Sequence, residues 1–387
     1  MARHHALIPR LASFAALLAG ALAAAPAGAQ QAKSWQFGAV LDVAHTTRAL
    51  ELGGRDQGLQ LGHSDLTASG PLGALATARL TAVFATHDGR LEKEIEEAWL
   101  ETTRLPAGFV ARAGRFASQI GYLNAQHPHA DDFVERPLLY RAFFGGHWND
   151  DGMRLNWTAP TPFFLQLGVE AFRGKRLVEE TAESTGNPGI ATVVAKFGGD
   201  IGASHSWLVG VSHIRNRREA TTETFDGAHG HKHDHDHDHH HHHGAQFSGH
   251  KTWMIDATWK WAPGGNNRDQ QVRAGFEAAR ITDLNRYATS RDRHEAQSIW
   301  AVWRFRPDWE TGLRTDWLRV RIPHGDHFHS GRLRELSAML AWKPNHMQSL
   351  RLQLTRQYDA VGFSRPASRS VQVQYVLAFG AHPAHPF

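Results

Sequence analysis

The chain has 387 residues, no cysteine, and 42 Lys and Arg against 38 Asp and Glu, a formal net charge of +4. This charge is too mild to imply nucleic acid as a partner. The lack of thiols excludes disulfides, thiolate metal sites and thiol catalysis.

The first residues read as an export signal. Arg3 and Arg10 flank the start of an apolar stretch over 11–25, and Ala27-Gly28-Ala29 has the small-x-small pattern of a cleavage site. We therefore predict a signal peptide over residues 1–29, cleaved after Ala29, and exclude it from the fold. An uncleaved anchor is the alternative, although the stretch is short for a membrane span.

The dominant period in the rest of the chain is two residues. Between 252 and 261, Trp253, Ile255 and Trp259 alternate with Asp256 and other polar residues. One apolar and one polar face per segment is typical of a β-strand between two different solvents. The pattern predicts sixteen strands, near 35–46, 58–69, 73–87, 91–104, 108–116, 151–158, 163–173, 189–198, 204–215, 250–262, 270–282, 297–306, 310–322, 332–343, 348–359 and 369–379.

The connections between these segments differ in length by parity. Even strands join the next odd strand through short Gly/Pro/Asn turns, whereas odd-to-even connections are mostly longer, above all 117–150 and 216–249. Outer-membrane barrels have short periplasmic turns and long external loops. We therefore predict an all-β, transmembrane antiparallel barrel of residues 30–387 in the outer membrane of a Gram-negative cell, in contact with its lipid.

Tryptophans near strand ends are candidates for the aromatic girdles at the two membrane interfaces. The last predicted strand also has an apolar face, and the chain finishes in Phe387. A terminal aromatic residue is typical of such barrels, although a Gly-Ala-His-Pro-Ala-His-Pro segment intervenes here. The tryptophan candidates are Trp35, Trp99, Trp157, Trp253 and Trp342.

Three segments resemble the family of phosphate-selective porins O and P. They are Phe109-Val110-Ala111-Arg112-Ala113-Gly114-Arg115-Phe116, Phe133-Val134-Glu135-Arg136-Pro137 and Gly152-Met153-Arg154-Leu155. The resemblance implies a trimeric, sixteen-stranded porin whose loop after the fifth strand, here 117–150, folds into the pore. That family binds phosphate with lumen arginines and a lysine cluster. Polar-face arginines are present at 79, 112, 154, 273 and 351, but no lysine cluster is evident, so phosphate selectivity is not implied.

A histidine-rich tract lies in the 216–249 loop. Ten of the 28 histidines fall within 229–243, where His alternates with Asp before five consecutive His. Imidazole binds Zn²⁺, Cu²⁺ and Ni²⁺, and carboxylates ligate or orient it. The predicted ligands are His229, His231, His233, Asp234, His235, Asp236, His237, Asp238, His239, His240, His241, His242 and His243. A purification tag and a solvated loop with incidental metal binding are the alternatives.

Further histidines lie in other predicted loops. His127 and His129 belong to the proposed pore loop, and His324, His327 and His329 follow the thirteenth strand. Each group could pass metal from the tract toward the lumen. Ordinary solvated histidines are the alternative for both groups.

These patterns predict a porin for small solutes that assists capture and passage of divalent metal, with zinc favoured as the bound or transported ion. No cofactor is required and no catalytic motif is present, so we predict that the protein is not an enzyme. The alternatives are a surface-anchored metal buffer with a closed barrel and a soluble periplasmic metal-binding protein. Active uptake through a plugged, larger barrel is disfavoured by the strand number.

Overall fold

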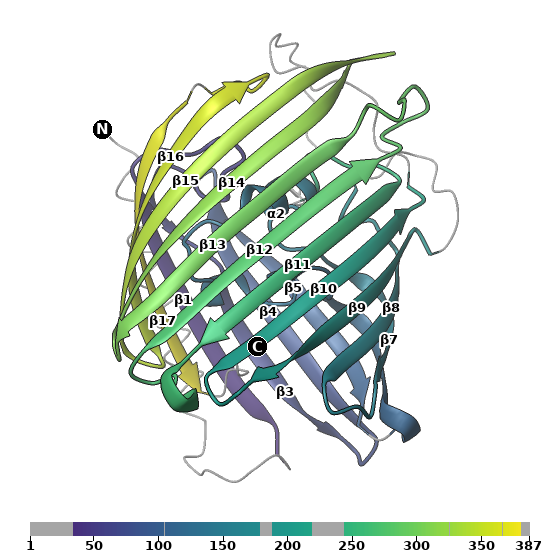
Figure 1. Cartoon of the computed structure of the whole chain (residues 1–387), viewed down its shortest axis with the longest axis vertical. Helices are drawn as coiled ribbons and strands as arrows, with labels where there is room; N and C mark the ends of the chain where they lie inside the picture. Colours follow the sequence, from purple (N-terminus) through teal and green to yellow (C-terminus); the bar gives the residue numbers. More distant parts are fainter. Residues whose placement is uncertain are drawn as a thin grey trace.

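The computed structural model describes residues 34–103, 105–178, 188–218, 244–324, 326–365 and 367–380. The chain forms one closed antiparallel sheet, in which the last strand pairs with the first (Figure 1). The strands are β1 (Gln36–Thr46), β2 (Gly58–Leu61), β3 (Ser64–Leu72), β4 (Ala76–His87), β5 (Arg90–Thr102), β6 (Phe109–Ala117), β7 (Asn149–Thr158), β8 (Phe164–Phe172), β9 (Ile190–Ile201), β10 (His205–Asn216), β11 (Lys251–Trp261), β12 (Gln271–Thr282), β13 (His294–Arg306), β14 (Trp309–His324), β15 (His327–Asn345), β16 (Gln348–Val361) and β17 (Arg369–Gly380).

Two of these elements, β2 and β3, are parts of a single barrel strand. β2 pairs with Val43–Thr46 of β1, and β3 pairs with Gln36–Val40 of the same strand. The ladder is interrupted between them at Gly62 and His63. The barrel therefore has sixteen strands, and every predicted segment overlaps one of them. The predicted fold class is confirmed.

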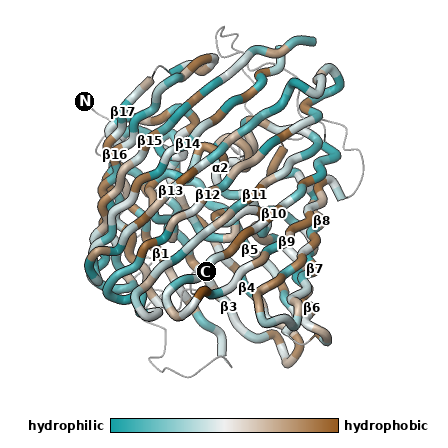
Figure 2. Tube along the Cα trace, viewed as in Figure 1, coloured by the Kyte–Doolittle hydropathy of each residue, from teal (hydrophilic) through white to brown (hydrophobic). Residues whose placement is uncertain are grey.

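Across the middle of the barrel the exterior is mostly apolar and the lumen mostly polar; near the long-loop end of β15 the pattern reverses, with Leu333 buried and Arg332 and Arg334 exposed. In β11, Trp253 and Ile255 are exposed, whereas Asp256, which follows Ile255, is fully buried. The same alternation of apolar and polar residues runs along the other strands (Figure 2). An apolar band around the middle of the barrel is what a lipid environment requires. Among the described residues no helix is long and apolar enough to cross a membrane.

The ends of the barrel differ as expected. Short turns such as 202–204 and 346–347 lie at one end, and β6 and β10, which lead into the two long connections, end at the other. At the long-loop end, however, β4 and β5 are joined only by Asp88 and Gly89, both with positive φ. Consecutive positive-φ residues form the tight turn that suits a twisted hairpin.

The segment 118–148 lies inside the barrel and carries the short helix α2 (Leu138–Phe143), together with the single-turn helix η2 (Pro128–Ala130) (Figure 1). Two further single-turn helices, η1 (Pro106–Gly108) and η3 (Pro263–Gly265), lie in turns at the short-turn end. Every residue of α2 is buried. Its apolar side chains pack against lumen-facing residues such as Met254, Leu318 and Leu333. We call 118–148 the inserted loop.

Polar contacts anchor the inserted loop to distant strands. Tyr140 donates a hydrogen bond to Glu277 of β12 at 2.5 Å. Arg141 donates to both carboxylate oxygens of Glu335 in β15, at 2.8 and 2.7 Å. The backbone N–H of Val134 donates to Gln353 of β16 at 2.7 Å. Since these partners come from separate strands, the loop is fixed across the lumen rather than to one wall.

Candidate metal centre

A β-bulge in β5 places two successive carboxylates in the lumen. Thr81 of β4 pairs with Glu97 and Ala82 pairs with Ile95, so Glu96 is the extra residue. Both Glu96 and Glu97 are buried, whereas their neighbours Ile95 and Ala98 face outward. A regular strand would turn one of the two side chains toward lipid, and bulges are a common means of redirecting a side chain.

The interruption between β2 and β3 brings a histidine to the same place. The N–H of Gly62 donates to the Asp42 carbonyl, and the N–H of Ser64 donates back to the Gly62 carbonyl, both at 2.8 Å. A Cβ on Gly62 would lie 2.3 Å from an Asp42 carboxylate oxygen, so this close approach requires glycine. His63 consequently leaves the ladder and reaches Glu96.

The inserted loop supplies the remaining imidazoles. His127 and His129 come from the segment around η2, and His147 comes from the end of the loop. The rings of His127 and His129 stack with centroids 5.6 Å apart. The centroid of His63 lies 5.6 Å from that of His127 and 6.3 Å from that of His147. Four histidines from the wall and the loop therefore converge.

Glu96 is at the centre of this group. One of its carboxylate oxygens lies 2.9 Å from His63 Nε2 and 2.6 Å from His147 Nδ1. The other lies 3.0 Å from His127 Nδ1. These four side chains, which we call the lumen cluster, are all largely buried.

Neighbouring carboxylates orient two of the rings. Glu97 lies 3.3 Å from His127 Nε2 and accepts hydrogen bonds from Thr81 and Trp99, both at 3.1 Å. Asp65 of β3 lies 3.1 Å from His129 Nδ1. A carboxylate on the far nitrogen of an imidazole fixes the ring and increases its basicity as a ligand. Trp99 lies on the same inward face of β5 as Glu97 and therefore faces the lumen. Its prediction as an interface residue is wrong.

The pKa values of the loop histidines diverge. Burial disfavours the charged ring, but hydrogen bonds and charge interactions with Glu96 and Glu97 hold the pKa of His127 well above its usual value. At His129 and His147 burial prevails and lowers the pKa. Lowered pKa values favour the neutral imidazole, which is the form that binds metal.

The donors suit a transition metal. Three imidazoles and a carboxylate form the mixed nitrogen and oxygen set that Zn²⁺, Co²⁺, Ni²⁺ and Cu²⁺ bind, whereas Mg²⁺ and Ca²⁺ prefer oxygen alone. Donors around tetrahedral Zn²⁺ lie about 3.3 Å apart for bonds of about 2.0–2.1 Å. Glu96 lies 2.6–3.0 Å from one nitrogen of each of the three histidines. His63, Glu96 and His147 offer ligand atoms that all lie within 4.8 Å of one another, so rotations of the side chains would admit an ion.

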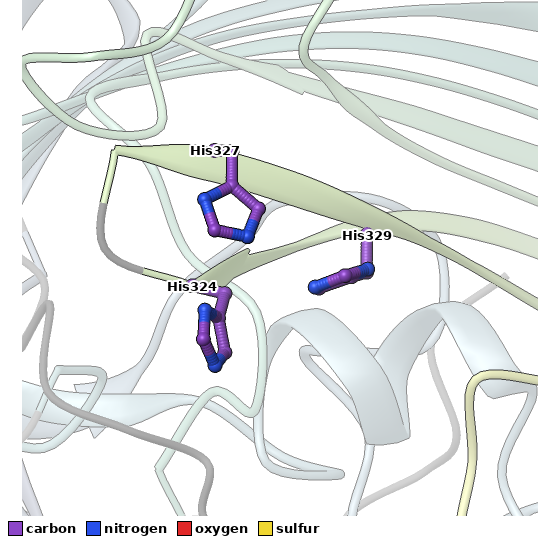
Figure 3. A group of neighbouring side chains, drawn as sticks. All are labelled: His324, His327 and His329. Atoms are coloured by element: carbon purple, nitrogen blue, oxygen red, sulfur yellow. The ribbon is translucent and has the colours of Figure 1, made fainter.

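A second histidine group lies at the barrel mouth. His324, His327 and His329 are exposed, with ring centroids 5.0–5.5 Å apart at the end of the β14–β15 hairpin (Figure 3). Sequence analysis expected them on a loop, but the strands continue until His324 pairs with His327. Because the ladder extends to this pair, rigid backbone holds the three rings together. One ligand atom from each lies within 4.8 Å of the others.

The histidine-rich tract 229–243 lies outside the described residues. Its C-terminal flank is described, and there Phe247 donates a backbone hydrogen bond to Ala142 of α2 at 3.0 Å. The Phe247 ring also packs near His294 and Phe363. The chain that follows the tract is therefore anchored on the inserted loop.

The arginines of the lumen form ion pairs with carboxylates of the protein. Arg112 pairs with Glu101 at 2.7 Å, and Arg154 pairs with Glu170 at 2.6 Å. Arg273 contacts both Asp132 and Glu310, at 2.6 and 3.1 Å. Carboxylates of the protein thus neutralise these arginines, whereas a row of arginines that binds phosphate would leave its charges available to anions.

The sequence analysis singled out His127, which lies in the lumen cluster, and His129, which lies beside it, but not His63, Glu96 or His147. The signal for Glu96 was present in Ile95-Glu96-Glu97, where two successive acids break the alternation of β5. His63 and His147 carry no local signal. Only closure of the barrel and insertion of the loop bring them to Glu96.

The comparisons with known proteins agree with the architecture. No family model matches the chain. A curated relative, an uncharacterised protein of Aquifex aeolicus, is 26% identical over an alignment of 359 positions that covers 86% of this chain and 70% of the relative. Among solved structures, OprB of Pseudomonas putida has a TM-score of 0.58 at 12% identity, covering 89% of this chain and 94% of its own. The fold is that of a porin.

Two further solved structures support this assignment of the fold. The anion-selective porin from Comamonas acidovorans has a TM-score of 0.53 at 11% identity, covering 90% of this chain and 99% of the porin. The outer membrane channel DcaP of Acinetobacter baumannii has a TM-score of 0.52 at 11% identity, covering 89% and 96%. The resemblance to porins thus holds at the level of fold, and the particular phosphate-selective family is not confirmed.

Proposed function

We propose that this protein is an outer-membrane channel for small solutes that also captures divalent transition metal, zinc above all, at its outer mouth. The observation that carries the proposal is a lipid-facing barrel whose lumen holds cavities toward both ends, each lined by several charged side chains. One cavity is lined by the long-loop ends of β4 and β5. Another is lined by residues near the short turns, including Asn267 and His346. A barrel that served only as an anchor has no need of either.

The histidine groups at the mouth supply the proposed capture. The trio His324, His327 and His329 lies at the long-loop end, and the tract 229–243 belongs to the loop between β10 and β11 at that same end. Together they would raise the local metal concentration, which matters when metal is scarce. The export signal over 1–29 and the trimer implied by the family resemblance belong to this proposal.

Conductance in planar bilayers tests the proposal. The intact protein is compared with one lacking 229–243, a deletion that retains the Phe247 anchor. We expect open channels from both, and a stronger response to low zinc concentrations from the intact protein. Channels that respond equally would leave a general porin with an incidental tract.

A surface metal buffer is the second candidate, favoured by the tight packing of the inserted loop around α2. Absence of channel current from protein shown to be folded by heat-modifiable gel mobility would favour this buffer. Release of the protein from cells by osmotic shock would contradict the membrane location itself.

A further inference from the structure

The lumen cluster lies where the two cavities approach each other. The cavity on the long-loop side has a volume of about 220 Å³ and is lined by His63, Glu96, Pro128 and His147. The cavity on the short-turn side, of about 430 Å³, is lined by the next residues of the loop, including His129. Successive residues of η2 therefore face different cavities, and the cluster forms part of the partition.

Two imidazole nitrogens in this partition lack hydrogen-bond partners among the described residues. The second carboxylate oxygen of Glu96 and His127 Nδ1 form an ion pair at 3.0 Å. His147 Nε2 and His63 Nδ1, the ring nitrogens that do not face Glu96, are buried without hydrogen-bond partners. Buried polar atoms without partners cost free energy, and a ligand is one explanation for retaining them.

We propose that His63, Glu96, His127 and His147 bind one divalent transition-metal ion, and that this ion ties the inserted loop to the barrel wall and closes the passage between the cavities. The inference rests on the proposed function, since closing a passage presupposes a channel. Two ligands belong to the wall and two to the loop, so a bound ion is a cross-link between them. Binding displaces the protons that the imidazoles share with Glu96.

The positive charge of the short-turn cavity favours an ion that stays bound in the lumen cluster over one that passes freely between the cavities. The short-turn cavity is lined by Lys260, Arg273, Arg304, Lys343 and Arg351. Arg273, Arg304 and Lys343 pair with the buried Glu310, and Arg273 also pairs with Asp132, so cations remain in excess over these two carboxylates. Like charges repel a divalent cation at short range. An ion in the cluster should therefore dwell there, and closure should occur as discrete, long events.

Single-channel recording in planar bilayers tests the site. The background protein lacks 229–243 and carries His324→Ala, His327→Ala and His329→Ala, which removes the external ligands. We expect added Zn²⁺ to produce discrete closures of the K⁺ current, and Mg²⁺ to produce none. His63→Ala or Glu96→Gln should raise the Zn²⁺ concentration for half-closure by at least about 10–100-fold, the range seen when even indirect metal partners are lost.

A matched control variant and a second measurement distinguish loss of the metal site from a general or folding defect. His205→Ala removes a histidine that stacks on Trp259 at the short-turn end, so it should leave zinc closure unchanged. The visible absorption of Co²⁺ added to the background protein should saturate at one equivalent and vanish in His63→Ala. Heat-modifiable mobility establishes that each variant is a folded barrel.

The results separate the inference from the proposed function. Open channels that zinc does not close, or closure that persists in both His63→Ala and Glu96→Gln, would overturn the inference and leave the channel intact. No current from any folded protein would overturn the channel, and with it the closure. Loss of the Co²⁺ spectrum in His205→Ala as well would show that the spectrum does not report on the lumen cluster and would also overturn the site.

Discussion

Single side chains inside this barrel are held by partners that lie far away in the chain. Arg141 of α2 and Arg314 of β14 both donate to Glu335 of β15, which is fully buried. Gln357 donates to the same carboxylate at 3.0 Å. Burial of such a charge is tolerated only because its acceptors are filled. The position of the inserted loop therefore depends on a few buried ion pairs.

Loss of one such partner should be costly. Arg141→Met leaves Glu335 with fewer donors in a buried place, and removing one member of a buried pair costs about 3–5 kcal/mol. We expect a value toward the lower end, because Arg314 and Gln357 remain. Urea unfolding in lipid or detergent measures it. Lys251→Met, which breaks the half-exposed pair with Asp283, should cost under about 1 kcal/mol. Equal costs would contradict the anchoring role.

At the scale of elements, the inserted loop fits the lumen through close backbone approaches. Gly121 has a φ of 59°, and a Cβ there would lie 2.3 Å from both the Tyr140 hydroxyl and the Met254 methyl group. The neighbouring N–H of Tyr122 donates to Glu277 at 2.8 Å. The start of the loop thus passes between α2 and the wall with no room for a side chain.

Gly121→Ala should loosen the loop without opening the barrel. The added methyl group must displace Tyr140 from Glu277, so we expect a larger and noisier single-channel conductance on the proposed function. Gly202→Ala is the control, because Gly202 has a similar φ of 61° in a turn where a Cβ meets nothing within 4 Å. An unchanged conductance in Gly121→Ala, or the same change in both variants, would show that loop packing does not set the conductance.

The molecule as a whole is organised by the contrast between its lipid-facing exterior and its filled lumen. Ile255 lies near the middle of β11 and faces outward, whereas Ile201 lies at the end of β9, also exposed. Charge on the lipid face of a barrel is costly at the bilayer midplane and cheap near the interfaces. The cost of a charged substitution at each of these two positions therefore indicates how deep that position lies in the bilayer.

Ile255→Arg should destabilise the barrel by about 2–4 kcal/mol, and Ile201→Arg by about 0–1 kcal/mol. Reversible unfolding in lipid vesicles measures both changes. Equal and small losses would be inconsistent with a membrane-spanning barrel of this orientation.

The sequence by itself determined the strands, their inward and outward faces and the sorting of turns and loops, because these follow from an alternation readable within each segment. It also singled out His127 and His129, which the structure places in and beside the lumen cluster. Only the tertiary structure decided the lumen cluster. His63 depends on an interrupted ladder and Glu96 on a bulge, and His147 reaches them only because the loop enters the lumen. Contacts between residues so distant in the chain leave no local periodicity, whereas each strand repeats its pattern within a few residues.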